Sequence, residues 1–158
     1  MKRSKLDKID LRILSDLQEN GRMTNVDLAQ NAGISAPPCL RRVRALEDNG
    51  YIEGYNAHVN KNYLGWTVTA YTSITLASAG DKDIQKFVET VDEWDQVRDC
   101  YTMIGDADFL LKIVARDFDD YQNFVQTNLT GIENIKTIKS NMIMKAIFKK
   151  PGVPIEVK

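Results

Sequence analysis

Two short segments of this 158-residue chain carry the side chains that could do chemistry. The first contains Arg41, Arg42 and Arg44, and it lies within residues 28–46, which include no acidic residue. Arginine binds phosphates and base edges through several hydrogen bonds at once, so this segment indicates contact with a nucleic acid. The alternative is that three arginines on a helix form a solvated face. The orientation of their helix decides between the two.

The second segment is Gly105-Asp106-Ala107-Asp108, in which two carboxylates flank a small residue. Paired acids serve in acid–base catalysis, bind a cation, or accept backbone N–H groups in turns. No constellation of histidine, serine or lysine accompanies the pair, so a turn or a ligand contact is favoured over catalysis. The single histidine, His58, has no nearby carboxylate or cysteine and is interpreted as structural.

Composition excludes several other functions. The formal net charge is -1, and 43% of the residues are hydrophobic, as in an ordinary globular protein. Cys39 and Cys100 are 61 positions apart with no CxxC motif, which excludes a zinc finger and indicates a reducing compartment. No motif supports nucleotide binding, and no apolar run approaches the roughly 18 residues of a membrane span. We therefore expect a cytoplasmic protein without a metal, a cofactor or a membrane partner.

The first third of the chain shows the periodicity of helices. Asp7 caps a first helix that ends at Asn20-Gly21, and Thr24 caps a short second helix that ends at Gly33. A tight turn then leads into a third helix, which Ser35 can cap. Two helices joined by a glycine turn predict a helix-turn-helix over residues 25–44.

The third predicted helix shows which way the arginines face. A projection at about 100° per residue places Leu40, Val43 and Leu46 on one apolar stripe with Cys39. The opposite face carries arginines and small residues, and the helix N-terminus adds a positive dipole. This face suits a phosphate backbone, with the first turn positioning the helix. The predicted DNA contacts are Ser35, Pro37, Pro38, Arg41, Arg42 and Arg44.

The remainder of the chain alternates between strand and helix patterns. Residues 51–55 predict a short hairpin or small wing, and the domain boundary falls near residue 60. Helices begin at Asp81 or Asp83 and at Asp117. Four strands are predicted, at residues 66–76, 97–103, 109–115 and 135–148. The order β-α-β-β-α-β is that of a ferredoxin-like sandwich, so the fold class is α+β.

In such a sandwich both helices cover one sheet face and leave the other open. The open face would carry apolar side chains from the third and fourth strands, namely Leu110, Val114, Ile143 and Ile147. An apolar face of this kind must be covered, and we expect burial against a second subunit.

Four segments follow one another along the chain, namely LDKIDLRILSDLQENGR, TNVDLAQNAGIS, APPCLRRVRALEDNGYIEGYNAHVN and MIGDADFLLKIV. In this order they resemble the Lrp/AsnC family of feast/famine transcriptional regulators, in its leucine-responsive branch. The first resembles the family's opening helix, and the third is the most specific of the four. The last resembles the family's strand-loop-strand signature in the ligand-sensing domain.

The resemblance implies a winged helix-turn-helix domain in residues 1–60 and a ferredoxin-like domain in residues 61–158. It implies that the second domain dimerises through its sheets, assembles further, up to an octamer, and binds leucine or another small amino acid between subunits. The effector residues carried over are Thr102, Met103, Gly105, Asp106 and Asp108. Two positions depart from the family: Arg41 replaces an acidic residue, and Thr130-Gly131-Ile132 replaces Pro-Gly-Val.

The expected function is that of a nucleoid-associated, homo-oligomeric regulator that binds double-stranded DNA sequence-specifically and responds to an amino acid, without enzymatic activity. Two alternatives remain. One is an architectural protein that wraps DNA with little sequence preference. The other is a small-molecule enzyme or binding protein that uses the loop of Asp106 and Asp108.

Overall fold

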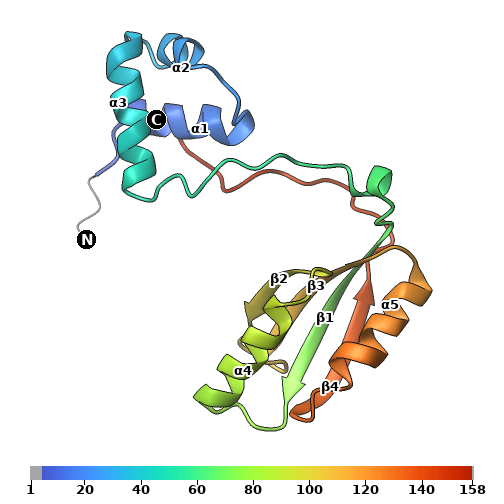
Figure 1. The fold of residues 1–158 in the computed structure, drawn as a ribbon. Coiled ribbons are helices and arrows are strands. Elements are labelled where there is room, and N and C mark those ends of the chain that lie inside the picture. The colour runs from blue at the N-terminus through green and yellow to red at the C-terminus, as the bar shows by residue number, and fades with distance from the viewer. Residues whose placement is uncertain (1–4, 158) are drawn as a thin grey trace. The chain divides into compact units, whose positions relative to one another are not determined.

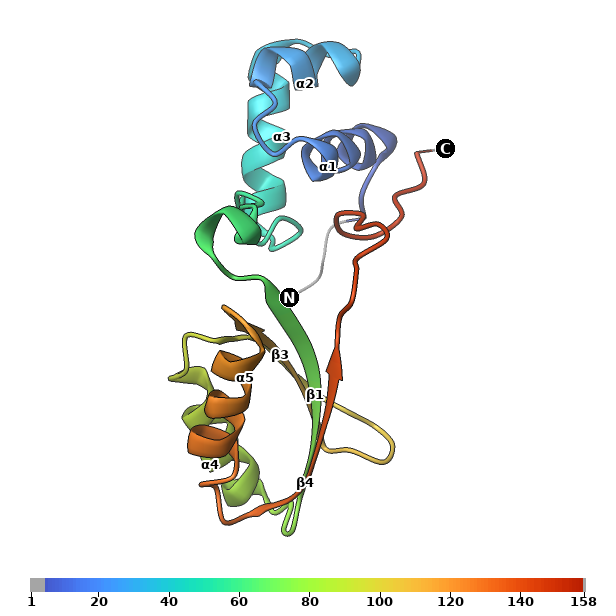
Figure 2. The same ribbon diagram turned by 90° about the vertical axis from the view of Figure 1, so that its right-hand side faces the viewer.

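The computed structural model describes residues 5–157 (Figures 1 and 2). They form two compact units, one made of residues 5–58 with 148–157 and the other of residues 59–147. Within the described residues, no helix is long and apolar enough to cross a membrane.

The first unit contains the three expected helices. They are α1 (Lys8–Glu19), α2 (Asn25–Asn31) and α3 (Ala36–Asp48). Asp7 and Asp10 form a capping box, in which each carboxylate accepts the other residue's backbone N–H, at 2.9 and 3.1 Å. Thr24 caps α2 through the N–H of Asp27. Ser35 occupies the N-cap position of α3, but its hydroxyl makes no capping hydrogen bond.

The core of this unit corrects the predicted stripe on α3. Cys39 and Leu46 are fully buried, whereas Leu40 is 40% exposed. The buried side of α3 is therefore centred on Cys39 and Leu46, which pack with Ile13 of α1 and Leu28 of α2. Burial raises the pKa of the Cys39 thiol, so this cysteine is a small core residue.

The predicted hairpin after α3 is absent, since none of the described residues 51–60 lies in a strand. The N–H groups of Tyr51 and Ile52 instead donate back to the carbonyl of Leu46, at 2.9 and 3.2 Å. The Tyr55 hydroxyl donates to Glu47 of α3 at 2.9 Å. The two backbone bonds satisfy a carbonyl group near the end of α3. Together with the Tyr55 bond they hold residues 51–55 against the helix, and these residues do not pair as strands.

The second unit has the predicted α+β order. Its strands are β1 (Val68–Leu76), β2 (Val97–Thr102), β3 (Phe109–Ala115) and β4 (Ile135–Met142). They form an antiparallel sheet in the order β2-β3-β1-β4. The helices α4 (Asp81–Asp92) and α5 (Phe118–Phe124, extended by a π-helical turn, Val125–Leu129) cover one face, as Figure 2 shows. The ferredoxin-like sandwich is confirmed.

A buried polar contact fixes α5 on the sheet. The hydroxyl of Tyr121 lies 2.8 Å from the hydroxyl of Thr72 in β1 and donates to the hydroxyl of Ser140 in β4 at 2.5 Å. Both Tyr121 and Thr72 are buried among apolar side chains that include Ile74 and Leu111. Because buried hydroxyl groups must be paired, these partners restrict how α5 can lie on the two strands.

The fourth strand is shorter than predicted. It ends at Met142 in place of residue 148, and the chain then continues as an irregular tail. Residues 148–157 of this tail group with the helical unit, although the sequence assigned them to the ferredoxin-like domain. The side-chain amide of Gln18 donates to the carbonyl of Val153 at 2.7 Å and accepts its N–H at 3.0 Å. This pairing depends on the backbone conformation of Gly152, the residue before Val153.

We expect Gly152→Ala to release the tail from α1. Gly152 has a φ of +53°, and an added Cβ would lie 1.9 Å from Oε1 of Gln18. Hydrogen exchange of the Val153 amide should accelerate roughly fivefold, as expected for the loss of a hydrogen bond of about 1 kcal/mol. Gly54→Ala, whose Cβ meets no atom within 4 Å, is the matched control. Equal exchange in both variants would contradict the contact.

Candidate nucleic-acid interface and ligand site

The helix-turn-helix is built from α2, a glycine turn and α3. Gly33 adopts a φ of +68°, and the following N–H, that of Ile34, donates to the carbonyl of Ala29 at 2.9 Å. The side-chain amide of Asn25 donates to the carbonyl of Ala36 at 2.8 Å, which joins the first residues of α2 and α3. Sequence reasoning missed this role of Asn25, because a single asparagine at a helix start usually suggests only a local cap.

Arg41 and Arg44 lie exposed on α3. Neither side chain makes a hydrogen bond or an ion pair with another residue of the described part of the chain. Both guanidinium groups are therefore available to an external anion. Their role as DNA contacts stays a prediction, as does that of Ser35, Pro37 and Pro38 in the first turn.

Arg42 is placed differently from its two neighbours. Its Nη1 lies 2.8 Å from a carboxylate oxygen of Asp7 and 2.7 Å from one of Asp10. Hydrogen bonds from Arg42 to Asp10 and then to Asp7 raise the pKa of the guanidinium. The structure thus pairs this side chain with the start of α1, and the DNA contact of Arg42 stays a prediction, as for its two neighbours.

The loop between β2 and β3 is held by backbone hydrogen bonds around Asp108. The N–H of Met103 donates to the Asp108 carbonyl at 2.8 Å, and the N–H of Asp108 donates to the carbonyl of Ile74 at 2.9 Å. The carboxylate of Asp108 accepts the N–H of Leu76 at 2.7 Å. Asp108 therefore serves as a turn residue that fastens the loop to the end of β1.

Asp106 is the acid of this loop that remains exposed. It borders an open hollow of about 380 Å³, whose lining residues are Ser73, Thr75, Asp106, Ala107, Lys136, Thr137 and Lys139. The lining brings a carboxylate, two ammonium groups and three hydroxyl groups together. Such a set offers acceptors to an ammonium group and donors to a carboxylate.

The lining differs in part from the predicted effector residues. Of those, only Asp106 lines the hollow; Thr102 and Met103 are exposed beside it in sequence, and Gly105 supplies a φ of +139° to the loop. Lys136 and Lys139 were missed, since they come from β4, about 30 positions further along the chain. The polar alternation of the two strands was the available signal, but it does not indicate which strands are neighbours.

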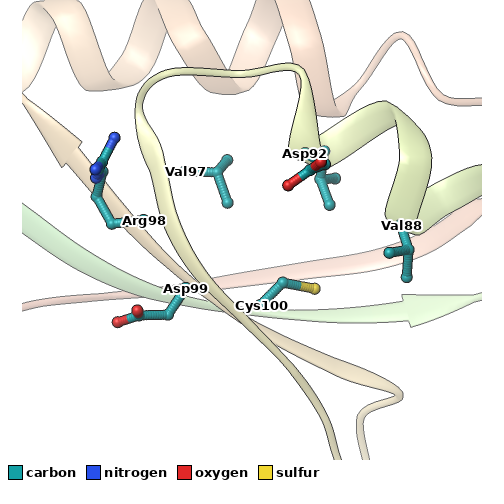
Figure 3. A pocket seen from close by; sticks show the side chains of 7 residues that line it. Val88, Asp92, Val97, Arg98, Asp99 and Cys100 are labelled. Atoms are coloured by element: carbon teal, nitrogen blue, oxygen red, sulfur yellow. The ribbon is translucent and has the colours of Figure 1, made fainter. Parts of the chain in front are cut away.

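A second hollow, of about 100 Å³, lies between α4 and β2 (Figure 3). Its wall includes Val88, Asp92 and Cys100. Burial first, and then the charge of Asp92, raises the pKa of the Cys100 thiol, so the thiol stays protonated at neutral pH. Asp99 is paired with Lys112 at 2.8 Å. Among the described residues no group of three or more His, Cys, Asp or Glu side chains could hold a metal ion.

Two family signatures span these sites. Residues 6–53 match a winged helix-turn-helix DNA-binding domain, and residues 69–153 match the Lrp/AsnC ligand-binding domain. The chain belongs to the Lrp/AsnC family of transcriptional regulators. It is thus a DNA-binding transcriptional regulator with a ligand-binding domain, and members of this family are regulators and not enzymes.

Individual Lrp/AsnC proteins are similar over nearly the whole chain. The leucine-responsive regulatory protein of Rhizobium meliloti is 41% identical over 98% of both chains, and the Bkd operon transcriptional regulator of Pseudomonas aeruginosa is 37% identical over 96% of this chain and 99% of that one. The structure of a transcriptional regulator from Neisseria meningitidis in complex with L-methionine superposes with a TM-score of 0.90 at 32% identity, covering 95% of this chain and 97% of that one.

We expect the acid stability of the helical unit to depend on Asp7. The N–H of Asp10 and, more weakly, Arg42 lower the pKa of the Asp7 carboxyl below its ordinary 3.8, against an opposing effect of desolvation. A lowered pKa stabilises the folded state above the ordinary value, and this contribution is lost as the pH falls through the lowered value. Urea unfolding should therefore show Asp7→Asn less stable than the wild type at neutral pH, with the difference closing below a pH of about 4. A difference that does not vary with pH would contradict this assignment.

Proposed function

We propose that this Lrp/AsnC protein binds operator DNA sequence-specifically through the exposed face of α3 and that a small amino acid controls this binding. The observation that carries the first part is the availability of Arg41 and Arg44 on α3, beside an Arg42 that is held within the protein. Two free guanidinium groups on an exposed helix face can bind phosphates and read guanine edges. We place its action at the nucleoid, in the cytoplasm.

We expect Arg41→Ala and Arg44→Ala to weaken DNA binding without loss of stability, because both side chains are exposed. A residue that contacts phosphate should lower the salt slope by about one unit, whereas a residue that reads a base should relax specificity at a cost of about 1–3 kcal/mol. Gel shifts over a salt series distinguish the two. Arg98→Ala, an exposed arginine of the second unit, is the matched control. Unchanged affinity in both α3 variants would remove this helix from the interface.

Gel shifts also test the alternative of an architectural protein that wraps DNA. A protein that wraps DNA with little preference would bind selected and random fragments alike, since its contacts go to phosphates and depend on DNA flexibility. An operator recovered from a random pool and bound about 1000-fold more tightly than bulk DNA would support the sequence-specific regulator.

The hollow beside Asp106 supports an amino acid as the effector. A zwitterion requires acceptors for its ammonium group and donors for its carboxylate, and Asp106 with Lys136 and Lys139 supplies both. The Neisseria relative was crystallised with L-methionine, which is consistent with a ligand of this class. We propose leucine or another small amino acid for the present protein, bound near Thr102, Met103, Gly105, Asp106 and Asp108.

We expect Asp106→Asn to weaken amino acid binding about 10- to 100-fold, the amount lost with a charge-assisted hydrogen bond of about 1.5–3 kcal/mol. Calorimetric titration of the twenty amino acids identifies the ligand and measures the effect. Asp95→Asn, an exposed acid elsewhere in the same unit, should bind like the wild type. Asp108→Ala is less informative because it also removes the acceptor of the Leu76 N–H. Absence of heat with every amino acid would count against this sensor.

We further propose that the uncovered face of the sheet forms a homodimer, with further assembly up to an octamer. This face carries the partly exposed Leu110 and Val114 on β3, next to Tyr71 of β1. The ion pair of Lys112 and Asp99 lies between them and gives the face a polar centre. An uncovered sheet face with apolar residues on its central strand suits an interface with two-fold symmetry.

We expect Val114→Glu to dissociate the dimer, since it would bury a charge without a partner. Sedimentation of the intact chain at micromolar concentration measures the result. Val26→Glu makes the same substitution on the exposed surface of α2, where Val26 is 65% exposed, and should leave the assembly intact. Wild-type assembly in Val114→Glu would place the interface elsewhere.

A further inference from the structure

We propose that Arg42 is a positioning residue, which fixes the orientation of α3 by pairing with the two carboxylates at the start of α1 and does not itself contact DNA. The inference rests on the proposed function of α3 as the DNA-facing helix. Its basis is that Arg42 differs from Arg41 and Arg44 in its partners, although all three lie within four residues on one helix.

The contact joins segments that are far apart in the sequence. Arg42 bonds to Asp10 across 32 positions and to Asp7 across 35 positions. The Asp10 side chain is only 17% exposed and that of Arg42 33%, so water screens this pair less than a fully exposed one. Asp7 and Asp10 are themselves fixed by their capping box. Arg42 therefore binds an acceptor pair whose position is already determined by α1.

Another carboxylate of α1, that of Asp16, makes a similar contact with α2. Asp16, which is 7% exposed, accepts the side-chain N–H of Asn31 at 2.9 Å and pairs with Arg12 at 3.1 Å. α1 thus pairs Asp10 with Arg42 of α3 and Asp16 with Asn31 of α2. Acidic partners of the helix-turn-helix lie on this neighbouring helix, while residues 28–46 contain none.

Apolar packing alone specifies the orientation of α3 weakly. Of its 13 residues only Cys39 and Leu46 are buried, while Ala36 and Val43 pack on the core with part of their surface exposed. Base readout requires side chains held within about 0.5 Å and 10–20° of their productive geometry. A single guanidinium nitrogen, Nη1 of Arg42, donates to both fixed carboxylates, and this pair of charge-assisted hydrogen bonds supplies the constraint.

One substitution distinguishes a positioning role of Arg42 from a purely electrostatic one, because the two predict opposite changes in DNA affinity. Asp10→Asn removes a negative charge near the bound polyanion, which by electrostatics alone should tighten DNA binding. The asparagine oxygen can still accept the N–H of Asp7, so the capping box is retained. If Arg42 positions α3, the same variant should instead bind DNA about three- to tenfold more weakly, with the number of phosphate contacts and hence the salt slope unchanged.

The experiment compares four full-length variants by gel shift over a salt series, each checked for folding by circular dichroism. Glu19→Gln, an exposed acid of the same helix, is the matched control and should bind DNA as tightly as the wild type or slightly more tightly. Arg42→Ala should weaken binding with an unchanged slope. Arg42→Lys keeps the charge but replaces the rigid guanidinium by a flexible ammonium group, so it should also bind more weakly than the wild type.

Two results would overturn the proposal. One is an Asp10→Asn protein that binds DNA as tightly as Glu19→Gln. The other is a salt slope lowered by about 0.9 in Arg42→Ala but not in Arg42→Lys, which would make Arg42 a phosphate contact. Failure of the underlying function is distinguishable, because Arg41→Ala would then leave DNA affinity unchanged.

Discussion

The pairing of Arg42 with Asp7 and Asp10 is the contact that, in our proposal, sets how α3 lies on α1. A helix that presents free arginines to DNA must be attached to the protein by its other side, and α3 offers only two fully buried side chains for that purpose. Three arginines in four positions consequently divide into two kinds. One is satisfied by α1, and the other two remain free for a polyanion, in a chain whose net charge is only -1. The DNA contact that we propose thus rests on a local surface and not on the overall charge.

In the ligand-binding unit, too, one residue of a pair holds the structure together while the other remains exposed. Asp108 uses both its backbone and its carboxylate to fasten the loop to β1, and Asp106, two residues earlier, is left exposed at the hollow. Glycine at position 105 permits the φ of +139° that this turn requires. On the opposite side of the sheet, Tyr121 joins α5 to β1 and β4 by buried hydrogen bonds. The strands that line the hollow are therefore the same strands that α5 holds.

The chain passes between its two units twice, once after residue 58 and again before residue 148. The second passage ends in a tail that Gln18 binds at both backbone groups of Val153. β4 thus supplies residues to the hollow and leads directly into a segment bound to α1, the helix that also holds α3.

The sequence by itself determined the element order, the helix-turn-helix and the free arginines, because local periodicity and capping residues encode them. It also identified the acidic loop and the family. Tertiary structure decided which residues meet. Arg42 and Asp10 are 32 positions apart, and Lys136 reaches the hollow from a strand that is adjacent to β1 only in the folded sheet. The predicted hairpin failed since the N–H groups of Tyr51 and Ile52 found acceptors in α3, and the predicted long strand ended early because its pairing with β1 stops at Met142, opposite Ala70. Partners distant in sequence leave no local pattern, so only the fold could select them.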